Sequence, residues 1–415
     1  MNFLDLVYRF IYLVLLMNVN LQRKIDQIIG VFICRILSLF NRNRRPALPP
    51  QGTRRILVIL LSEMGSLVLA HPMLQLLKST YPQASISVLQ FKKNREILEI
   101  MDVVPRDNIY TLDPSSPVKL FKDIMRVVIQ LRRRQFDVSI DCELFHRISS
   151  ILSFLSGAPV RVGFHRHTQE GLYRGNFINS PVLYNPYQHI SQQFITLAES
   201  IGSDAFPRVK RLVTPLNAKL PSVQLTRAET EAFAERLQAQ RPIAAGKKMV
   251  LIYPSGGLLS IRAWPLESYC RLAERLLKAG YAVGIIGLKE DQALAETIQA
   301  HCGHADCIDL TGFTQTLREL MVLFHLAALL ITNDGGPGQF SALTPIPTIV
   351  FFGPETPILY GPLDDKTAVF HLPLSCSPCL SAYNHRNSPC DGDNICLTSI
   401  GVEAVVEKAL NMLTT

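Results

Sequence analysis

Hydrophobic and polar positions follow two alternating patterns from residue 56 onward. Short apolar runs predict strands at 56–61, 85–91, 109–112 and 138–140. Between them, apolar positions spaced three or four residues apart predict helices at 67–79 and 118–134. Strands that alternate with helices form a parallel, doubly wound sheet, so this part of the chain predicts an α/β domain of the Rossmann type.

The same alternation starts again at residue 249 and predicts a second Rossmann-like domain. Strands are expected at 250–253, 282–286, 329–332 and 348–352, with helices at 266–279, 291–300 and 317–328. Residues 165–221 are rich in Tyr, Asn, Pro and His, which favours long loops at a domain junction. We expect an N-terminal domain over 53–240 and a C-terminal domain over 245–415, with ligands bound where the parallel strands end.

The first 50 residues predict a membrane-associating helical appendage and a linker. Phe10–Met17 is apolar but has only eight residues, whereas a bilayer-spanning helix needs about 20. From Leu21 to Phe40, apolar residues recur at helical spacing with charged residues between them, which predicts an amphipathic helix lying in the membrane interface. The alternative is that these helices cap the core of the first domain. Residues 42–52 are basic and proline-rich, which is typical of a linker.

The charge distribution favours attraction of this appendage to an anionic membrane surface. The formal net charge is +8, and residues 1–45 supply +5 of it, as seven basic residues against two acidic ones. Basicity confined to one terminal segment does not predict a nucleic-acid partner. No cleavable export signal accompanies the apolar run, so the nine cysteines are expected to be free thiols. We expect a cytoplasmic protein, peripheral at the inner face of the cytoplasmic membrane.

Three segments carry the most specific motifs. The first is RILVILLSEMGSLVLAHPML at Arg55–Leu74, which predicts a strand, a tight turn at Gly65 and a helix. The second is LIYPSGGLLSIRAWP at Leu251–Pro265. The third spans Leu329–Leu363 and contains NDGGPGQFSAL and PTIVFFGPETPILYGPL. Their order and content resemble glycosyltransferase family 9, the lipopolysaccharide heptosyltransferase family, over about residues 55–410. The resemblance implies the GT-B fold of two facing Rossmann-like domains. It also implies an enzyme that moves a sugar, heptose being one option, from a nucleotide diphosphate sugar to a lipopolysaccharide or other lipid-linked glycan, with inversion at the anomeric carbon.

The residues themselves favour a diphosphate site in the second domain. A segment that follows a strand and opens a helix presents backbone N–H groups that bind anions. Arg262 adds a permanent charge suited to phosphate, so no metal cofactor is required; the family usually carries Lys there. Taken alone, a glycine-rich turn is as often structural, and Arg262 would be a surface charge. The turn consists of Asn333, Asp334, Gly335, Gly336, Pro337 and Gly338.

The resemblance assigns further donor-binding residues. It implies that Asp334 holds hydroxyls of the donor sugar, that Glu290 contacts the ribose and that Thr311 lines the base pocket. Glu290 could equally be an exposed carboxylate at a helix start, and Thr311 part of a simple turn. Ser255 and Gln339 complete the predicted set, and Gln339 stands where the family usually carries His. That departure favours a subfamily with a different donor or acceptor.

The general base does not stand at the position where the family usually carries it. Inverting transfer requires a base beside the acceptor hydroxyl. The family usually supplies an Asp directly after the first-loop glycine, but this chain has Ser66, which carries no negative charge at neutral pH. Glu63, three residues earlier, and His71, in the following helix, are the candidates, although Glu63 could also be an ordinary solvated acid.

Four cysteines gather near the C-terminal end of the chain: Cys376, Cys379, Cys390 and Cys396. Four thiolates are a ligand set for structural zinc, although the second pair lacks the tight CxxC spacing. We expect the four cysteines to stabilise the local structure rather than to take part in catalysis.

Two rival functions remain open at this level. A catalytically inactive GT-B protein that binds nucleotide sugar or acts as a scaffold is suggested by Ser66, and another GT-B transferase with a different donor is the alternative within the same class. A nicotinamide dehydrogenase is disfavoured, because neither predicted Rossmann domain carries GxGxxG after its first strand.

Overall fold

The computed structural model describes residues 26–40, 52–61, 63–144, 146–164, 173–203, 219–242, 246–381, 386–390 and 393–414. The chain divides into two compact units, Met1–Ala218 and Lys219–Thr415. Each unit contains a six-stranded sheet in which all neighbouring strands run parallel. The predicted α/β class with two Rossmann-like sheets is therefore confirmed.

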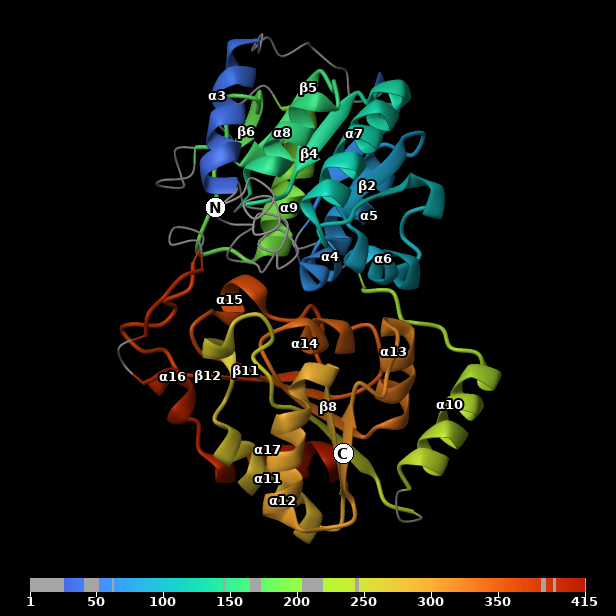
Figure 1. Cartoon of the computed structure of the whole chain (residues 1–415), viewed down its shortest axis with the longest axis vertical. Helices are drawn as coiled ribbons and strands as arrows, with labels where there is room; N and C mark the ends of the chain where they lie inside the picture. Colours follow the sequence, from blue (N-terminus) through green and yellow to red (C-terminus); the bar gives the residue numbers. More distant parts are fainter. Residues whose placement is uncertain are drawn as a thin grey trace, which may run out of the picture. The chain divides into compact units, whose positions relative to one another are not determined.

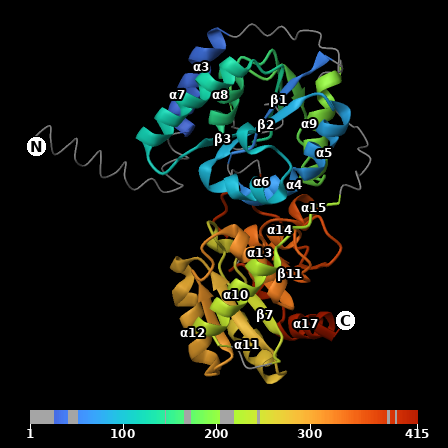
Figure 2. The ribbon, with the colours of Figure 1, turned by 90° about the vertical axis from the view of Figure 1, so that its right-hand side faces the viewer.

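The sheet of unit 1 has the strand order β3-β2-β1-β4-β5-β6 (Figure 1). Its strands are β1 Arg55–Ile59, β2 Ser85–Phe91, β3 Ile109–Leu112, β4 Val138–Asp141, β5 Val160–Phe164 and β6 Ser180–Val182. Its α-helices are α3 Val31–Leu39, α4 Met64–Leu69, α5 His71–Thr80, α6 Arg95–Met101, α7 Pro117–Arg134, α8 Arg147–Leu155 and α9 Ile190–Glu199. Short helical turns are η1 Asp26–Gly30, η3 Lys92–Asn94, η4 Arg106–Asn108 and η6 Ser200–Gly202. Helices α3, α8 and α7 lie on one side of this sheet, and α5 and α9 lie on the other (Figure 2).

The sheet of unit 2 has the order β12-β11-β10-β7-β8-β9. Its strands are β7 Met249–Tyr253, β8 Ala282–Gly287, β9 Cys307–Thr311, β10 Leu329–Asn333, β11 Thr348–Phe352 and β12 Thr367–His371. Its α-helices are α10 Arg227–Gln240, α11 Leu266–Lys278, α12 Gln292–Cys302, α13 Leu317–Leu326, α14 Gly336–Ser341, α15 Pro357–Tyr360, α16 Ile395–Thr398 and α17 Val402–Thr414. Short turns are η7 Ser260–Arg262 and η8 Lys289–Asp291. The amphipathic helix α11 packs between α12 and α17 and against β8, and its apolar face joins the core to which β7 and β10 also contribute.

Helix α10 lies in unit 2, whereas the sequence places residues up to 240 in the first domain. Its start is fixed by a capping box in which the Thr226 side chain and Glu229 satisfy each other's backbone N–H groups. Along the helix, Arg236 forms an ion pair with Glu319 of α13 at 2.8 Å and lies over the ring of Phe313. Contacts with α13, which periodicity cannot reveal, decide where this helix belongs.

The N-terminal segment joins the core of unit 1 through one face of α3. Cys34 is fully buried against Ile151 and Phe177, and Ile33 and Leu37 pack beside it. The opposite face exposes large apolar side chains: Ile28, Ile29, Phe32, Ile36, Leu39 and Phe40. The helix therefore caps the domain core on one side and keeps an apolar face on the other. Among the described residues, no helix is both long and apolar enough to cross a bilayer.

Several local expectations are corrected by the structure. Gly65 lies inside α4 rather than in a turn, and the expected helix over 67–79 is two helices that meet at Ala70. The segment 165–221 was expected to consist of long loops, but within it β6 pairs with β5 and α9 packs on α5. The apolar signals of β6 and α9 are short, so packing on the sheet rather than local pattern determines these elements.

Candidate functional site

Both sheets reverse their strand order at one point, which is where open parallel sheets bind ligands. In unit 2 the reversal falls between β7 and β10, because β8 and β9 lie beyond β7 while β11 and β12 lie beyond β10. In unit 1 it falls between β1 and β4. The predicted site residues that directly follow β1, β7 and β10 therefore lie at these two switch points.

The side chain of Asn333, the last residue of β10, forms hydrogen bonds that link the segments at the unit 2 switch point. Its Oδ1 accepts hydrogen bonds from the Trp264 backbone N–H at 2.9 Å and the Tyr269 hydroxyl at 3.1 Å. Its Nδ2 donates to the carbonyl oxygens of Tyr253 and Ser255. All its polar atoms are used within the protein, so its structural role is to position the loop after β7. Direct donor contact by this side chain stays a prediction.

Near Asn333, Arg262 and Asp334 form an ion pair in which some hydrogen-bonding atoms have no partner among the described residues. Both side chains are largely buried, and Arg262 Nη1 lies 3.6 Å from Asp334 Oδ2, beyond hydrogen-bond length. Neither Arg262 Nε nor Asp334 Oδ2 has a hydrogen-bond partner among the described residues. Buried polar atoms are normally paired, so these two are the strongest candidates for ligand contacts in unit 2.

A second acid and a second arginine, missed at the sequence level, extend this cluster. Glu355, just after β11, lies 2.9 Å from Nε of Arg386, whose guanidinium lies over the Tyr360 ring. Burial, followed by the neighbouring Asp334 carboxylate, raises the pKa of Glu355 to about 8. Burial also raises the pKa of Asp334, and Arg262 opposes that rise. This shift favours the protonated form of Glu355 at neutral pH.

The loop after β7 brings Ser255 and Arg262 to this cluster. Ser255 Oγ accepts the N–H of Gly257 at 3.1 Å, and an added Cβ on Gly256 would lie 2.6 Å from the Leu259 carbonyl oxygen. Only glycine at position 256 allows this close return of the backbone. The turn η7 then ends at Arg262, whose side chain lies close to Asp334.

The other predicted donor residues differ in their surroundings. Gln339 is buried, with Nε2 donating to the Tyr360 carbonyl oxygen at 2.7 Å and Oε1 unpartnered among the described residues. Thr311, the last residue of β9, donates a hydrogen bond from its hydroxyl to Asp309 of the same strand, and Glu290 is exposed in η8. Gly335, Gly336, Pro337 and Gly338 lead from β10 into the six-residue α14. The donor roles of these residues stay predictions.

In unit 1, the three predicted catalytic residues, Glu63, Ser66 and His71, lie after β1 but in different surroundings. Glu63 is the N-cap residue of α4 and is partly exposed, and Ser66 Oγ donates a hydrogen bond to Glu63 Oε2 at 3.1 Å. His71 is only 1% exposed, lies 3.1 Å from the Gln75 side chain, and has its pKa lowered by burial. Ser66 thus orients Glu63, and His71 is less accessible to a substrate.

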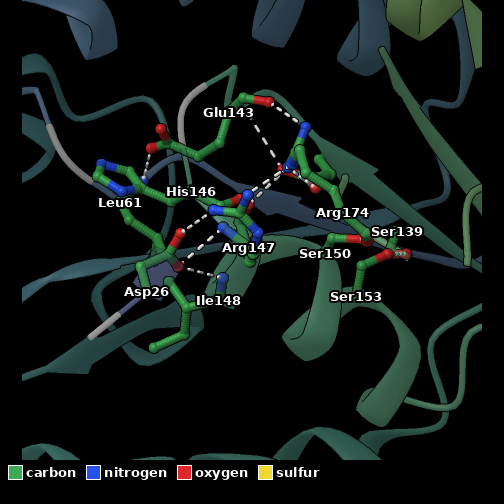
Figure 3. A network of polar contacts seen from close by, with 12 residues as sticks. Asp26, Leu61, Ser139, Glu143, His146, Arg147, Ile148, Ser150, Ser153 and Arg174 are labelled. Carbon is green, nitrogen blue, oxygen red and sulfur yellow. Dashed lines mark hydrogen bonds and ion pairs between the residues drawn. The ribbon is translucent and has the colours of Figure 1, made fainter. Parts of the chain in front are cut away.

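The sequence analysis does not predict two further acids at this switch point, Asp141 and Glu143, of which Figure 3 labels Glu143. Glu143 Oε1 accepts the Leu61 N–H at 2.6 Å, and Asp141, the last residue of β4, forms a buried ion pair with Arg174. Burial raises the pKa of Asp141 to about 6, against the effect of Arg174. Arg174 also donates to the carbonyl oxygens of Glu143 and His146. An acid directly after an apolar strand, as in Ile140-Asp141, was the signal available in the sequence.

A structural zinc site at the four C-terminal cysteines stays a prediction. Burial raises the pKa of Cys396 to about 11, and the other three thiols add to this rise, so the four cysteines share one neighbourhood. Their exposure nevertheless ranges from exposed Cys376 to buried Cys396. Within the ranges that the structure describes, no three His, Cys, Asp or Glu side chains are arranged to hold a metal ion.

Comparisons with known proteins agree with this architecture. The family model described as glycosyltransferase family 9 (heptosyltransferase) matches residues 124–388. Lipooligosaccharide heptosyltransferase 2 of Haemophilus ducreyi is 25% identical over 325 residues, which cover 77% of this chain and 88% of that protein.

Two solved structures extend the comparison to the fold. The E. coli ADP-heptose lps heptosyltransferase II has a TM-score of 0.67 at 21% identity, covering 87% of this chain and 98% of its own. The iron-containing dodecameric glycosyltransferase TibC from enterotoxigenic E. coli H10407 has a TM-score of 0.51 at 14% identity, covering 88% and 77%. At these identities the two structures establish the GT-B fold.

Proposed function

Because this chain belongs to glycosyltransferase family 9, we propose that it transfers a heptose, or a related sugar, from a nucleoside diphosphate sugar to a lipopolysaccharide-type acceptor. The chain is a glycosyltransferase by family, and heptose and the acceptor are suggested by the names of its relatives. The observation that carries the proposal is the pair of unpartnered atoms, Arg262 Nε and Asp334 Oδ2, at the unit 2 switch point.

The two charges of this pair suit the two halves of a sugar donor. The guanidinium of Arg262 is matched to diphosphate oxygens, which gain negative charge as the bond to the sugar breaks. The carboxylate of Asp334 accepts hydrogen bonds from sugar hydroxyls. Arg262 supplies the positive charge for the leaving group without a metal ion, so we propose a metal-independent reaction.

Inversion follows from direct attack by the acceptor hydroxyl on the anomeric carbon, opposite to the leaving diphosphate. A base must remove the hydroxyl proton during this attack. Glu63 is the residue best placed in unit 1, because it is partly exposed and Ser66 orients its carboxylate. In this scheme the oxygen of the acceptor forms the new bond, the diphosphate leaves, and Glu63 receives the proton.

The acceptor chemistry also suggests where the enzyme works. A lipid-linked acceptor requires access to a membrane surface, and the outer face of α3 offers exposed apolar side chains. We propose that the protein is cytoplasmic and binds the inner face of the cytoplasmic membrane through its N-terminal segment. Residues 1–25 and 41–50, which carry part of that expectation, lie outside the described residues.

The deciding experiment is a transfer assay with the full-length protein. ADP-, UDP- and GDP-linked sugars are incubated with a lipid-linked lipopolysaccharide core acceptor in buffer containing EDTA, and release of the nucleoside diphosphate is compared with and without acceptor. Acceptor-dependent release with ADP-heptose supports the proposal, whereas release that requires added metal removes its metal-independent part. Tight donor binding without transfer to any acceptor favours the inactive scaffold instead.

A further inference from the structure

Helix α7 of unit 1 is apolar on two separate faces. The inner face buries Val127 and Leu131 in the core formed with β1, β2 and β3. The outer face exposes Val118, Phe121, Met125 and Ile129 by 60%, 65%, 49% and 48%. Their spacing of three, four and four residues places them in one stripe along the helix. Such a continuous outer stripe is not needed for packing on the sheet.

Basic side chains accompany this apolar stripe. The 18 residues of α7 contain six basic residues and one acid, Asp123, which pairs with Arg126 at 2.7 Å. Lys122, Arg126 and Arg133 are exposed and, by helical spacing, lie along one side of the stripe. An apolar stripe bordered by basic side chains is the pattern by which helices bind anionic lipid surfaces.

Helix α3 presents a second apolar face on the same side of the sheet. Both α3 and α7 pack against α8, and the two views show all three helices on that side (Figures 1 and 2). The outer side chains of α3 include Phe32 and Leu39, exposed by 64% and 82%. The two exposed faces belong to one rigid unit, so they can contact one surface together.

A buried ion pair fixes α3 in this position. The Asp26 carboxylate accepts the backbone N–H groups of Arg147 and Ile148 at the start of α8 and pairs with the Arg147 guanidinium at 3.0 Å (Figure 3). Any side chain on Gly30 would approach the Cδ of Arg147 to about 3.1 Å. The turn before α3 is thereby held on α8, with the apolar residues of α3 directed outward.

We propose that α7 is a second membrane-contact helix, which with α3 seats unit 1 on an anionic bilayer. The occupant is a lipid surface because apolar side chains and Lys or Arg occur together, matching acyl chains and acidic headgroups. The inference rests on the proposed lipid-linked acceptor and extends it beyond the N-terminal segment. It also predicts that lipid contact survives at α7 when the outer face of α3 is made polar.

Vesicle co-sedimentation of the full-length protein tests the proposal. The vesicles contain phosphatidylethanolamine and phosphatidylglycerol, with phosphatidylcholine vesicles as the uncharged reference. Phe121→Ser combined with Met125→Ser should weaken binding about tenfold or more. Lys122→Gln combined with Arg133→Gln should weaken it about fivefold per charge, with the difference lost at high salt. Tyr187→Ser, at an exposed aromatic residue of unit 1 outside both helices, is the matched control and should bind like wild type.

A fluorescence measurement checks insertion directly. The chain has one tryptophan, Trp264, which is almost fully buried, so a Phe121→Trp variant adds an exposed reporter. Lipids with brominated acyl chains should quench it, and should leave Tyr187→Trp unquenched.

Several outcomes would overturn the proposal. If the α7 variants bind vesicles like wild type while Phe32→Ser with Ile36→Ser loses binding, α3 alone is the contact. If the α7 variants change oligomeric state but not vesicle binding, the stripe belongs to a second copy of the chain. If wild type binds no vesicle, the membrane proposal fails with this one, whereas sugar transfer is judged separately by nucleoside diphosphate release.

Discussion

The two switch points share one topology but treat their charged groups differently. In unit 1, Asp141 pairs with Arg174, and Glu143 accepts a hydrogen bond from the Leu61 backbone. In unit 2, Asp334 and Arg262 face each other at 3.6 Å, and each keeps an atom without a partner among the described residues. Charged side chains whose hydrogen bonds are all formed within the chain fix the geometry of the loops. Charged side chains that keep an atom without a partner can form hydrogen bonds with a ligand.

The largest effect is expected at the partly exposed acid of unit 1. Glu63→Gln should lower turnover by about 10²–10⁴-fold and leave donor affinity nearly unchanged, because the base acts on the acceptor hydroxyl. Steady-state transfer rates and nucleoside diphosphate titrations measure the two quantities. The matched control is Asp107→Asn, an exposed acid of the same unit.

The complementary variant sharpens the assignment of the base. Ser66→Asp restores the carboxylate that the family usually carries and should raise the turnover of Glu63→Gln. Full turnover in Glu63→Gln would remove Glu63 from the mechanism and leave His71, or a base from the acceptor-binding region, as the candidate.

Breaking the satisfied pair of unit 1 should mainly reduce stability. Arg174→Ala leaves the buried Asp141 carboxylate and two carbonyl oxygens without their donor, which costs about 3–5 kcal/mol of unfolding free energy. Urea unfolding measures this loss. Arg106→Ala, at an exposed side chain 4.0 Å from Glu99, should change stability by less than about 1 kcal/mol. Equal effects of the two variants would contradict a structural role for the pair.

The corresponding change in unit 2 should reduce affinity for the nucleoside diphosphate, besides any loss of stability from leaving the buried Asp334 without Arg262. Arg262→Ala is expected to weaken nucleoside diphosphate binding about 10- to 100-fold, because a charge-assisted hydrogen bond to phosphate is lost. Calorimetric titration measures the dissociation constant, and Arg271→Ala, at an exposed arginine of α11, is the control. An unchanged dissociation constant would show that Arg262 does not bind the diphosphate, and that the unit 2 switch point does not differ from that of unit 1 in having charged atoms available to a ligand.

A further expected effect concerns the pH dependence of stability in unit 2. The folded-state pKa of Glu355 is about 8, above its ordinary value of 4.5, so the folded chain retains a proton that the unfolded chain loses. Its contribution to stability is therefore full below about pH 4.5 and declines as pH rises toward 8. Glu355→Gln should flatten this decline in the unfolding free energy measured between these pH values. A wild-type slope in the variant would assign the decline to other groups.

The unpredicted elements show where local pattern fails. The inner strands β2 and β11 match their predicted bounds, because strands buried on both faces are rich in apolar residues. The short edge strand β6, Ser180–Val182, has no apolar run and forms because β5 offers it hydrogen bonds. Likewise, Glu355 and Arg386 are 31 residues apart and only the fold brings them to 2.9 Å.

The sequence by itself determined the two parallel α/β sheets, the family, and the loops that follow β1, β7 and β10. These features could be predicted because hydrophobic periodicity and short motifs involve residues that are close together in the chain. Tertiary structure alone decided which charges are satisfied. It showed that both polar atoms of the Asn333 side chain form hydrogen bonds within the protein, whereas Asp334 and Arg262 each keep an atom without a partner among the described residues. It also showed that α3 buries one apolar face and exposes the other. The physical reason is that burial and hydrogen-bond pairing depend on segments far apart in the chain, whose approach no local pattern records.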